Sequence, residues 1–250
     1  MPEATPSPRQ SQITSRRRLV ALPGGHDRAR RHNVPAEVSS FIGRETELAE
    51  VMRLLSSNRL VTLVGPGGAG KTRLALAAAA ELVEVFDDGP WVVELGSLSN
   101  PSLVPQALAS TLGVRERPGR APSTTLCEIL QNKSVLLVLD NCEHLIDACT
   151  SLTETLLHAC TELRIMATSR EALGLTGEVA WPVPPLTLPD RGRQLMPDEI
   201  SGYESVRLFV ERVVAIKPSF ALTAANAASV VQVAERLDVP GQDMGSGVAA

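Results

Sequence analysis

The chain has 250 residues and a formal net charge of −4, with 44% hydrophobic residues but only 3% aromatic ones. This composition predicts a core of Leu, Val, Ile and Ala, and the acidic balance argues against generic nucleic-acid binding by the whole chain. No apolar stretch approaches the length of a membrane span, and the N-terminus lacks the apolar segment of a secretory signal. We therefore expect a cytoplasmic protein that does not contact a membrane.

Residues 1–33 are rich in Pro, Ser, Gln, Arg and Gly, and they have almost nothing apolar to bury. Seven arginines against Glu3 and Asp27 give this segment a charge of +5, which leaves −9 for the rest of the chain. We expect a disordered basic tail. Its arginines either contact DNA or RNA weakly or form an ordinary solvated tail, and we favour the second interpretation.

The folded part opens at Asn33, and apolar residues at helical spacing between 48 and 55 predict a first helix. Residues 60–64 then form a short apolar run typical of a buried strand. Residues 65–72 fit the pattern G-x-x-x-x-G-K-[ST] of a phosphate-binding P-loop, and the helix-forming run 74–80 follows. A Gly-rich turn before a helix is the alternative, but the strand before the pattern and the helix after it favour the P-loop.

The residue types of this segment suit a nucleoside triphosphate. Glycines let backbone N–H groups approach the phosphates, and the start of the following helix adds its own N–H groups and positive dipole end. Lys71 is expected to reach the β- and γ-phosphates, and the Thr72 hydroxyl is expected to hold Mg²⁺. The predicted phosphate-side residues are Gly65, Pro66, Gly67, Gly68, Ala69, Gly70, Lys71, Thr72 and Arg73.

Strands and helices alternate along the rest of this region. Further strands are predicted at 91–95, 135–140, 163–170 and 179–183, and helices at 101–112, around 126–130 and at 145–160. This alternation predicts an α/β fold, a P-loop NTPase three-layer sandwich with a parallel sheet. We place the NTPase domain at 34–190, a partial helical subdomain with helices 203–214 and 224–237 at 191–238, and a disordered tail at 239–250.

Three further residues are candidates for the chemistry. Asp140 ends an all-apolar strand, where a Walker B carboxylate binds Mg²⁺ and where ligands lie in open α/β sheets; the alternative is a turn-capping Asp. Asn141 stands where many ATPases carry the catalytic glutamate, so Glu143 either activates water or simply begins the next helix. Arg170 closes a strand that can lie beside the Walker B strand, so it either reads the γ-phosphate or is a surface arginine.

The four cysteines, Cys127, Cys142, Cys149 and Cys160, form no CxxC pair and sit in apolar surroundings. Zinc ligation and a disulfide framework are possible readings of four cysteines. We favour reduced thiols packed in the interior.

Taken together, the segments 41–45, 65–72, 136–144, 167–171, 181–186 and 205–209 resemble the STAND class of P-loop NTPases. Within it, the pattern is similar to the NB-ARC-like module of large bacterial LuxR-type and SARP-type transcriptional regulators. The resemblance implies an ATP/ADP-binding switch for signal transduction, with Mg²⁺, weak ATPase activity and a homo-oligomer in the ATP form. It also implies that Val34, Phe41, Ile42 and Arg44 line the adenine side and that Arg170 is the sensor arginine.

The resemblance stops at Asp238, where a G-L-P-L-A motif is expected and Val239-Pro240-Gly241 stands instead. We therefore expect a truncated module that holds ADP loosely, with DNA binding left to missing domains. Two other functions stay open. One is a P-loop kinase for a small molecule, for which the loop at 113–122 supplies Arg115, Arg117 and Arg120. The other is a non-catalytic nucleotide-binding scaffold or DNA-binding fragment.

Overall fold

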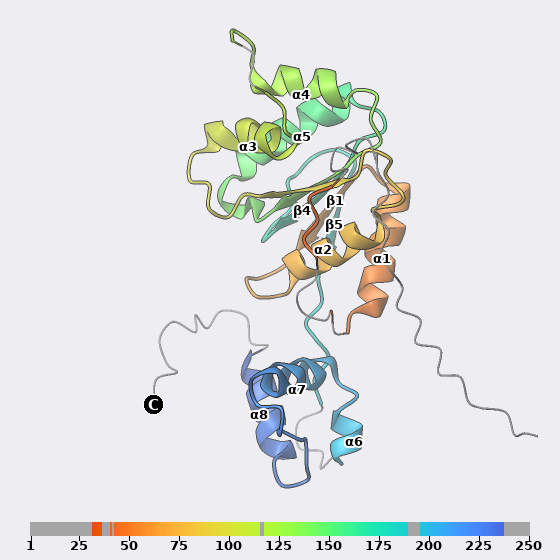
Figure 1. Ribbon diagram of the computed structural model, residues 1–250, viewed down its shortest axis with the longest axis vertical. Helices are drawn as coiled ribbons and strands as arrows, with labels where there is room; N and C mark the ends of the chain where they lie inside the picture. The colour runs from red at the N-terminus through yellow and green to blue at the C-terminus, as the bar shows by residue number, and fades with distance from the viewer. Residues whose placement is uncertain (1–31, 37–40, 42, 116–117, 190–195, 238–250) are drawn as a thin grey trace, which may run out of the picture. The chain divides into compact units, whose positions relative to one another are not determined.

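A five-stranded parallel sheet organises the fold (Figure 1). The computed structural model describes residues 32–36, 41, 43–115, 118–189 and 196–237. Within these ranges the strand order is β2-β3-β4-β1-β5. The strands are β1 (Leu60–Val64), β2 (Pro90–Glu94), β3 (Leu136–Asp140), β4 (Arg164–Ser169) and β5 (Glu178–Pro182). The predicted α/β P-loop NTPase fold is confirmed, with the P-loop strand between β4 and β5.

Helices cover both faces of the sheet, which makes the three layers (Figure 1). One face carries α1 (Glu45–Ser57) and α2 (Lys71–Glu81). The other carries α3 (Val104–Thr111), α4 (Pro122–Leu130) and α5 (Ile146–Ala159). Two single turns of 3₁₀-helix, η1 (Pro101–Leu103) and η2 (Cys142–His144), precede α3 and α5.

The core consists of two aliphatic clusters, one on each face, and alternate residues of the same strand supply both. In β3, Leu137 and Leu139 face α3–α5, whereas Leu136 and Val138 face α1 and α2. Because both faces are covered, the strand is apolar almost throughout, as the sequence predicted. Cys142, Cys149 and Cys160 are also buried, in the cluster on the α3–α5 face.

The predicted helix at 101–112 differs from the structure at its start. Residues 101–103 form the 3₁₀ turn η1, and the α-helix begins only at Val104. Asn100 is the expected N-cap, since its Oδ1 accepts from the Ser102 backbone N–H at 3.0 Å. A second proline, Pro105, lacks the N–H that would bond back to residue 101, which explains why the first turn is not α-helical.

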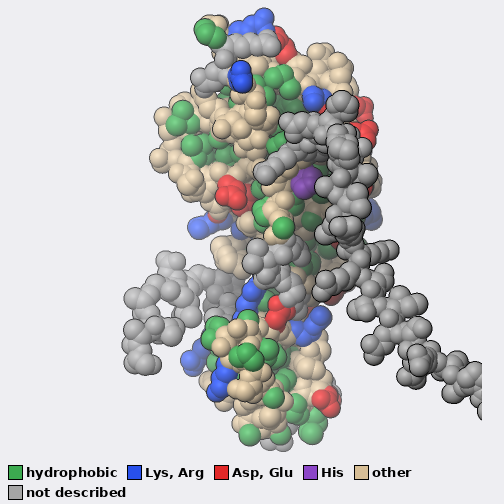
Figure 2. Space-filling view, viewed as in Figure 1, with side chains coloured by type: hydrophobic (Ala, Val, Ile, Leu, Met, Phe, Trp, Pro, Cys, Tyr) green, Lys and Arg blue, Asp and Glu red, His purple; other side chains and the backbone are tan. Residues whose placement is uncertain are grey.

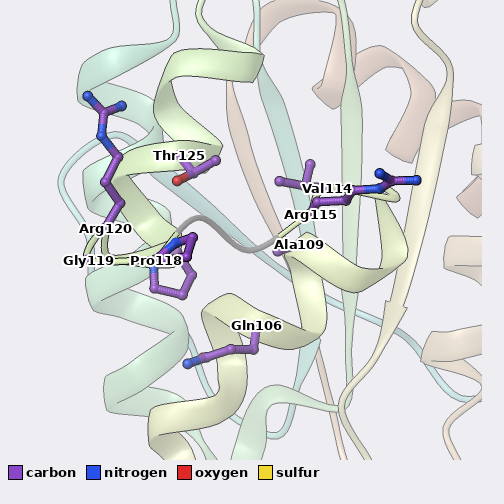
Figure 3. A pocket seen from close by; sticks show the side chains of 9 residues that line it. Gln106, Ala109, Val114, Arg115, Pro118, Gly119, Arg120 and Thr125 are labelled. Carbon is purple, nitrogen blue, oxygen red and sulfur yellow. The ribbon is translucent and has the colours of Figure 1, made fainter.

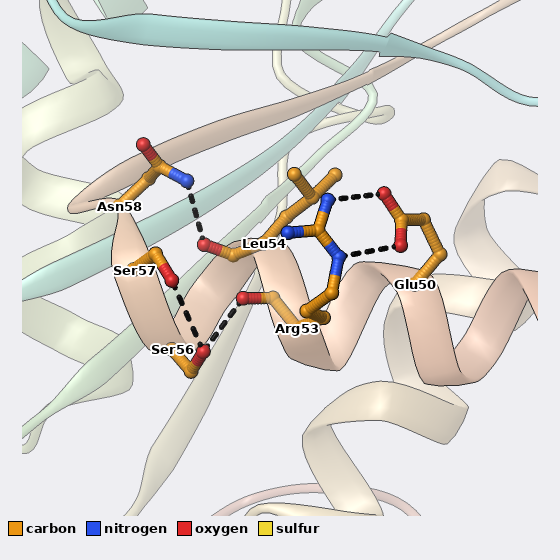
Figure 4. Close-up of polar contacts among 6 residues, drawn as sticks. All are labelled: Glu50, Arg53, Leu54, Ser56, Ser57 and Asn58. Atoms are coloured by element: carbon orange, nitrogen blue, oxygen red, sulfur yellow. Dashed lines mark hydrogen bonds and ion pairs between the residues drawn. The ribbon is translucent and has the colours of Figure 1, made fainter.

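Side-chain hydrogen bonds stabilise the C-terminal part of α1, just before β1 (Figure 4). Arg53 makes two hydrogen bonds to Glu50, at 2.7 and 2.6 Å, one turn earlier on the helix. The Asn58 side-chain amide donates to the Leu54 carbonyl at 2.9 Å. The Leu54 carbonyl thus accepts both the backbone N–H and the side-chain amide of Asn58, and the chain leaves the helix in an extended conformation that leads into β1.

The outer edge of β2 is occupied by a side chain. Asn33 Nδ2 donates to the Val92 carbonyl at 2.8 Å, and the Val92 N–H donates to Asn33 Oδ1 at 2.6 Å. Val92 is therefore bonded as a strand residue would be, although no strand lies on that side among the described residues. The bonds hold the segment around Asn33 at the edge of the sheet opposite β5.

A group of helices follows the sheet: α6 (Pro197–Ile200), α7 (Glu204–Ile216) and α8 (Ala227–Leu237). Val206 of α7 forms a buried cluster with Val230 and Ala234 of α8, and the Phe209 and Phe220 rings meet edge to face with centroids 6.4 Å apart. The helices predicted at 203–214 and 224–237 are therefore present. The tails proposed at 1–33 and 239–250 lie almost wholly outside the described residues. Within the described ranges, no helix has both the length and the apolar character needed to cross a bilayer.

The burial of β1 yields a stability prediction. Leu63 is fully buried between the sheet and α2, so Leu63→Ala should lower the free energy of unfolding by about 2–5 kcal/mol in urea denaturation. Leu103→Ala removes the same atoms from a side chain that is 42% exposed, and it should cost far less. Equal losses for the two variants would contradict the described core.

Candidate functional site

The loop between β1 and α2 has the geometry of a phosphate-binding loop. Gly68 and Gly70 have φ values of 79° and 80°, a left-handed conformation that other residues rarely adopt. Gly70 is the N-cap of α2, and no side chain caps this helix. The first N–H groups of α2 and the positive end of its dipole therefore face the loop, as an anion site requires.

Lys71, the first residue of α2, has its side chain folded over this loop. Its Nζ donates to the carbonyls of Gly65 and Pro66, at 2.9 and 3.0 Å, and the residue is only 8% exposed. Burial lowers the pKa of the Lys71 amine; the negative charge of Glu143 opposes this shift, and Arg170 adds to it. A buried ammonium group whose charge is only partly balanced favours a bound anion.

Thr72, at the start of α2, meets Asp140 and Thr168, which lie at the C-terminal ends of β3 and β4. Asp140 Oδ1 accepts hydrogen bonds from the Thr72 hydroxyl at 2.7 Å and the Thr168 hydroxyl at 2.6 Å. Thr168 Oγ1 in turn accepts the Asn141 backbone N–H at 2.8 Å. The carboxylate is thus aimed at the start of α2, which is where the sequence placed a metal-binding pair.

Glu143 and Arg170, two of the predicted catalytic residues, contact each other. Arg170 Nε lies 3.4 Å from Glu143 Oε1, and the Glu143 side chain is 17% exposed against 68% for Arg170. The other carboxylate oxygen of Glu143, Oε2, is buried and has no hydrogen-bond partner among the described residues. An Arg170 terminal nitrogen would lie 3.7 Å from a Cβ on Gly67, so the guanidinium sits over the P-loop.

A cavity of about 140 Å³ adjoins the P-loop. Its lining residues are Phe41, Arg44, Gly68, Ala69, Gly70, Arg73, Leu186 and Leu208. Phe41 and Arg44 were expected on the adenine side, and the structure brings both to the loop. Val34 packs instead against the core cluster of α1 and α2, close to Asn33 at the β2 edge, and Ile42 lies outside the described residues.

A second cavity, about 480 Å³, lies between α3 and α4 (Figure 3). Gln106, Thr125, Arg115 and Arg120 are among its lining residues, and it shares none with the P-loop cavity. Arg120 is paired with Glu128. The structure therefore does not bring Arg115 and Arg120 to the phosphate loop, and Arg117 lies outside the described residues.

The surface carries charges of both signs. On the face shown in Figure 2, the basic and acidic side chains of the described residues are interspersed among apolar and neutral ones rather than gathered by sign. A duplex nucleic acid is bound by clustered basic side chains. This face of the described residues does not present such a cluster.

Sequence reasoning missed three residues of the site. Thr168 lies in the segment 167–171, to which the sequence assigned no hydroxyl role; the available signal was a hydroxyl at the polar end of a strand that can lie beside the Walker B strand. Leu186 lines the P-loop cavity from the connector, the segment 183–189 that follows β5, and Leu208 lines it from α7. Both lie in segments that carry the family resemblance, 181–186 and 205–209, but neither was given a role, because apolar residues at such positions are equally expected in a core.

The parallel sheet, the P-loop and the facing carboxylate define a P-loop NTPase-type nucleotide-binding module. The family model of Novel STAND NTPase 1 matches residues 32–174, more than half of the chain. The chain belongs to this family.

Several mycobacterial proteins are similar to this chain. An uncharacterized protein of Mycobacterium tuberculosis is 40% identical over 207 residues, covering 83% of this chain and 49% of its own length. A second M. tuberculosis protein, which carries the name of an HTH-type transcriptional regulator, is 42% identical over 187 residues, covering 74% of this chain but 19% of its own length. The chain therefore spans about half the length of the first relative and a fifth of the second.

Solved structures with a similar arrangement include a STAND protein with a tetratricopeptide repeat sensor from Pyrococcus horikoshii. It has a TM-score of 0.49 and 15% identity, over 80% of this chain and 28% of that protein. A Walker-type ATPase of Pyrococcus abyssi has a TM-score of 0.48 and 16% identity, over 78% of this chain and 63% of its own.

The Thr168 contacts yield a testable prediction. Thr168→Val removes one of the two hydrogen bonds to Asp140 and the acceptor for the Asn141 N–H. We expect calorimetry to show about tenfold weaker ATP binding with Mg²⁺ and a smaller change in EDTA. Thr62→Val is the matched control, because Thr62 is also fully buried in the sheet and its hydroxyl has no partner among the described residues. A loss of equal size in both variants would argue against an electrostatic role for Thr168.

Proposed function

We propose that the chain is an ATP/ADP-binding regulatory switch module with slow ATP hydrolysis, part of a signal-transduction or transcriptional regulator. The observation that carries the proposal is the 2.7 Å contact between Thr72 and Asp140 beside the buried Lys71. Two oxygen ligands and one buried cation at a helix N-terminus are the groups that a Mg²⁺–triphosphate needs.

Thr72 and Asp140 fit Mg²⁺. Their oxygens come from different elements yet share a hydrogen bond, so a hard cation that takes oxygen ligands meets both at one place. The Thr168 hydroxyl holds the carboxylate on its other side. When bound with a nucleotide, the ion supplies charge neutralisation at the phosphates.

Slow hydrolysis follows from the surroundings of Glu143. The residue directly after Asp140 is Asn141, which cannot act as a carboxylate base. Arg170 pairs with one Glu143 oxygen and the other oxygen is buried, so neither is open to an attacking water until this arrangement changes. That ion pair is weak because the Arg170 side chain is largely solvent-exposed. The guanidinium can then turn towards a γ-phosphate on the same P-loop, so one side chain would report which nucleotide is bound.

The regulatory part of the proposal has separate support. The family is one of STAND NTPases, and one relative bears the name of an HTH-type transcriptional regulator in which the similar region is 19% of the length. A module of this kind would respond to nucleotide and pass the response to other parts of a longer protein, with self-association in the ATP form. DNA contact would belong to those other parts.

The direct test is to identify the nucleotide that co-purifies with the chain and to measure its turnover with Mg²⁺. Bound ADP or ATP with a slow turnover supports the switch. Rapid transfer of phosphate to a small-molecule acceptor would contradict the switch function and would support a small-molecule kinase.

Lys71→Ala should abolish ATP and ADP binding, because it removes the cation folded over the P-loop. The fold should persist, since the ammonium contacts only loop carbonyls. Lys133→Ala is the control: this lysine pairs with Asp88, away from the P-loop, and its loss should leave affinity unchanged. Calorimetric affinities that are unaltered in Lys71→Ala would refute the P-loop assignment.

Asp140→Ala and Glu143→Gln should separate binding from turnover. The first removes the carboxylate shared by Thr72 and Thr168, so Mg²⁺-dependent ATP affinity should fall by roughly ten- to a hundredfold. The second keeps the shape but removes the base, so affinity should hold while the rate of phosphate release drops by about 10²-fold or more. If Glu143→Gln hydrolyses ATP at the parent rate, Glu143 is not the catalytic base and simply begins the next helix.

A further inference from the structure

The carboxylate of Glu204, the first residue of α7, joins three segments that are distant in sequence. Its Oε1 accepts the Arg44 backbone N–H at 2.6 Å. Its Oε2 accepts the Thr187 backbone N–H at 3.2 Å and lies 3.4 Å from the Thr187 hydroxyl. The Glu204 N–H donates back to that hydroxyl at 3.0 Å, so α7 is fixed to the connector and to the start of α1.

The residue held in this way, Arg44, has an unusual backbone. Its φ of 62° and ψ of 23° are left-handed, a conformation that a side chain with a Cβ disfavours. Arg44 is nevertheless buried, with 6% exposure, and one guanidinium nitrogen donates to the Pro184 carbonyl at 3.0 Å. The guanidinium carbon would lie 3.7 Å from a Cβ on Gly70, so the side chain is seated against the P-loop and lines its cavity.

Gly43 makes the close approach of Glu204 possible. Gly43 also has a positive φ, 67°, and a Cβ there would lie 2.6 Å from Glu204 Oε1. The pair Gly43-Arg44 therefore leaves a gap that the carboxylate fills. Although partial burial opposes the charged form, hydrogen bonds from Arg44 and Thr187 lower the pKa of Glu204, so the carboxylate is ionised at neutral pH.

We propose that Glu204 is a positioning residue of the nucleotide site, holding Arg44 in the left-handed conformation that places its guanidinium on the base side of the P-loop cavity. Leu208, one helical turn further along α7, lines the same cavity. The carboxylate thus fixes two residues that line the cavity: Arg44 through a direct hydrogen bond, and Leu208 through the helix that the carboxylate anchors. The inference rests on the proposed function in one respect, that a nucleotide base occupies this cavity.

Two ligands separate this role from a general effect on folding. ADP needs both the phosphate loop and the base side, whereas inorganic tripolyphosphate needs only the loop and Lys71. Glu204→Ala should weaken ADP binding by roughly tenfold in calorimetry, the loss expected when a charge-assisted hydrogen bond is removed. Tripolyphosphate affinity should stay within about twofold of the parent, and the difference between the two ligands is the diagnostic result.

Arg207→Gln is the matched control. Arg207 and Glu45 also link α7 to α1, but their atoms are 4.0 Å apart and both side chains are largely exposed. Removing this ion pair takes away a charge at the same junction without touching Arg44, so ADP affinity should not change. An ADP loss in Arg207→Gln equal to that in Glu204→Ala would overturn the assignment to Glu204.

Gly43→Ala tests the same contact from the other side, because its Cβ would displace the carboxylate. Gly43→Ala should weaken ADP binding and leave tripolyphosphate binding unchanged. The double variant with Glu204→Ala should lose less ADP-binding free energy than the sum of the two single losses. If Glu204→Ala does not fold, Glu204→Gln keeps the shape without the charge and should show a smaller loss of the same selectivity.

The outcomes distinguish the proposal from the proposed function. If the parent chain binds ADP and neither Glu204 variant changes its affinity, the positioning role is wrong and the nucleotide site stands. Equal weakening of ADP and tripolyphosphate would also refute it, because the defect would then lie in the whole fold. Failure of the parent chain to bind either ligand would instead overturn the proposed function.

Discussion

The hydrogen bonds of the Asp140 carboxylate hold the site together. One oxygen accepts from a hydroxyl on α2 and from another on β4, and the second of these hydroxyls also receives the backbone of Asn141. Charge-assisted bonds of this kind are stronger than neutral ones. The order β3-β4-β1 places the Walker B strand two positions from the P-loop strand, and Thr168 occupies the strand between them. Without that hydroxyl the carboxylate would have to reach the start of α2 unsupported.

Charge at the phosphate loop is left incompletely balanced. Lys71 is desolvated, and the Glu143 carboxylate interacts electrostatically with both Lys71 and the more exposed Arg170. One Glu143 oxygen is buried without a partner among the described residues. Unsatisfied polar groups of this kind cost stability, and they concentrate where a ligand completes the arrangement. A nucleotide with its cation would supply both the anion that Lys71 favours and a new partner for Arg170.

Local signals predicted the sheet and the strand-loop-helix arrangement of the P-loop. The P-loop pattern, the apolar strand before it and the all-apolar strand ending in Asp140 each carry their meaning within a few residues, and the structure places them as expected. The cavity beside the P-loop was harder to predict, because its walls include Phe41, Arg44, Leu186 and Leu208, which come from separate segments. Leu208 gives no sign of a cavity in an amphipathic helix, and the left-handed Arg44 is understandable only once Glu204, 160 residues away, is beside it. At 101–112 only the start of the predicted helix differs, and the reason is local, a second proline in the first turn.

The amide of Asn33 bears on how copies of this fold can assemble. Exposed strand edges invite further strands, and proteins often block them. In β2 the first residue is Pro90, which has no N–H to offer, and both polar backbone groups of Val92 are already taken by Asn33. At the opposite edge, β5 ends in Pro182. Among the described residues these groups make both borders of the sheet poorer templates for another strand, which favours self-association through helices and loops, whose contacts can be made and released without unravelling the sheet.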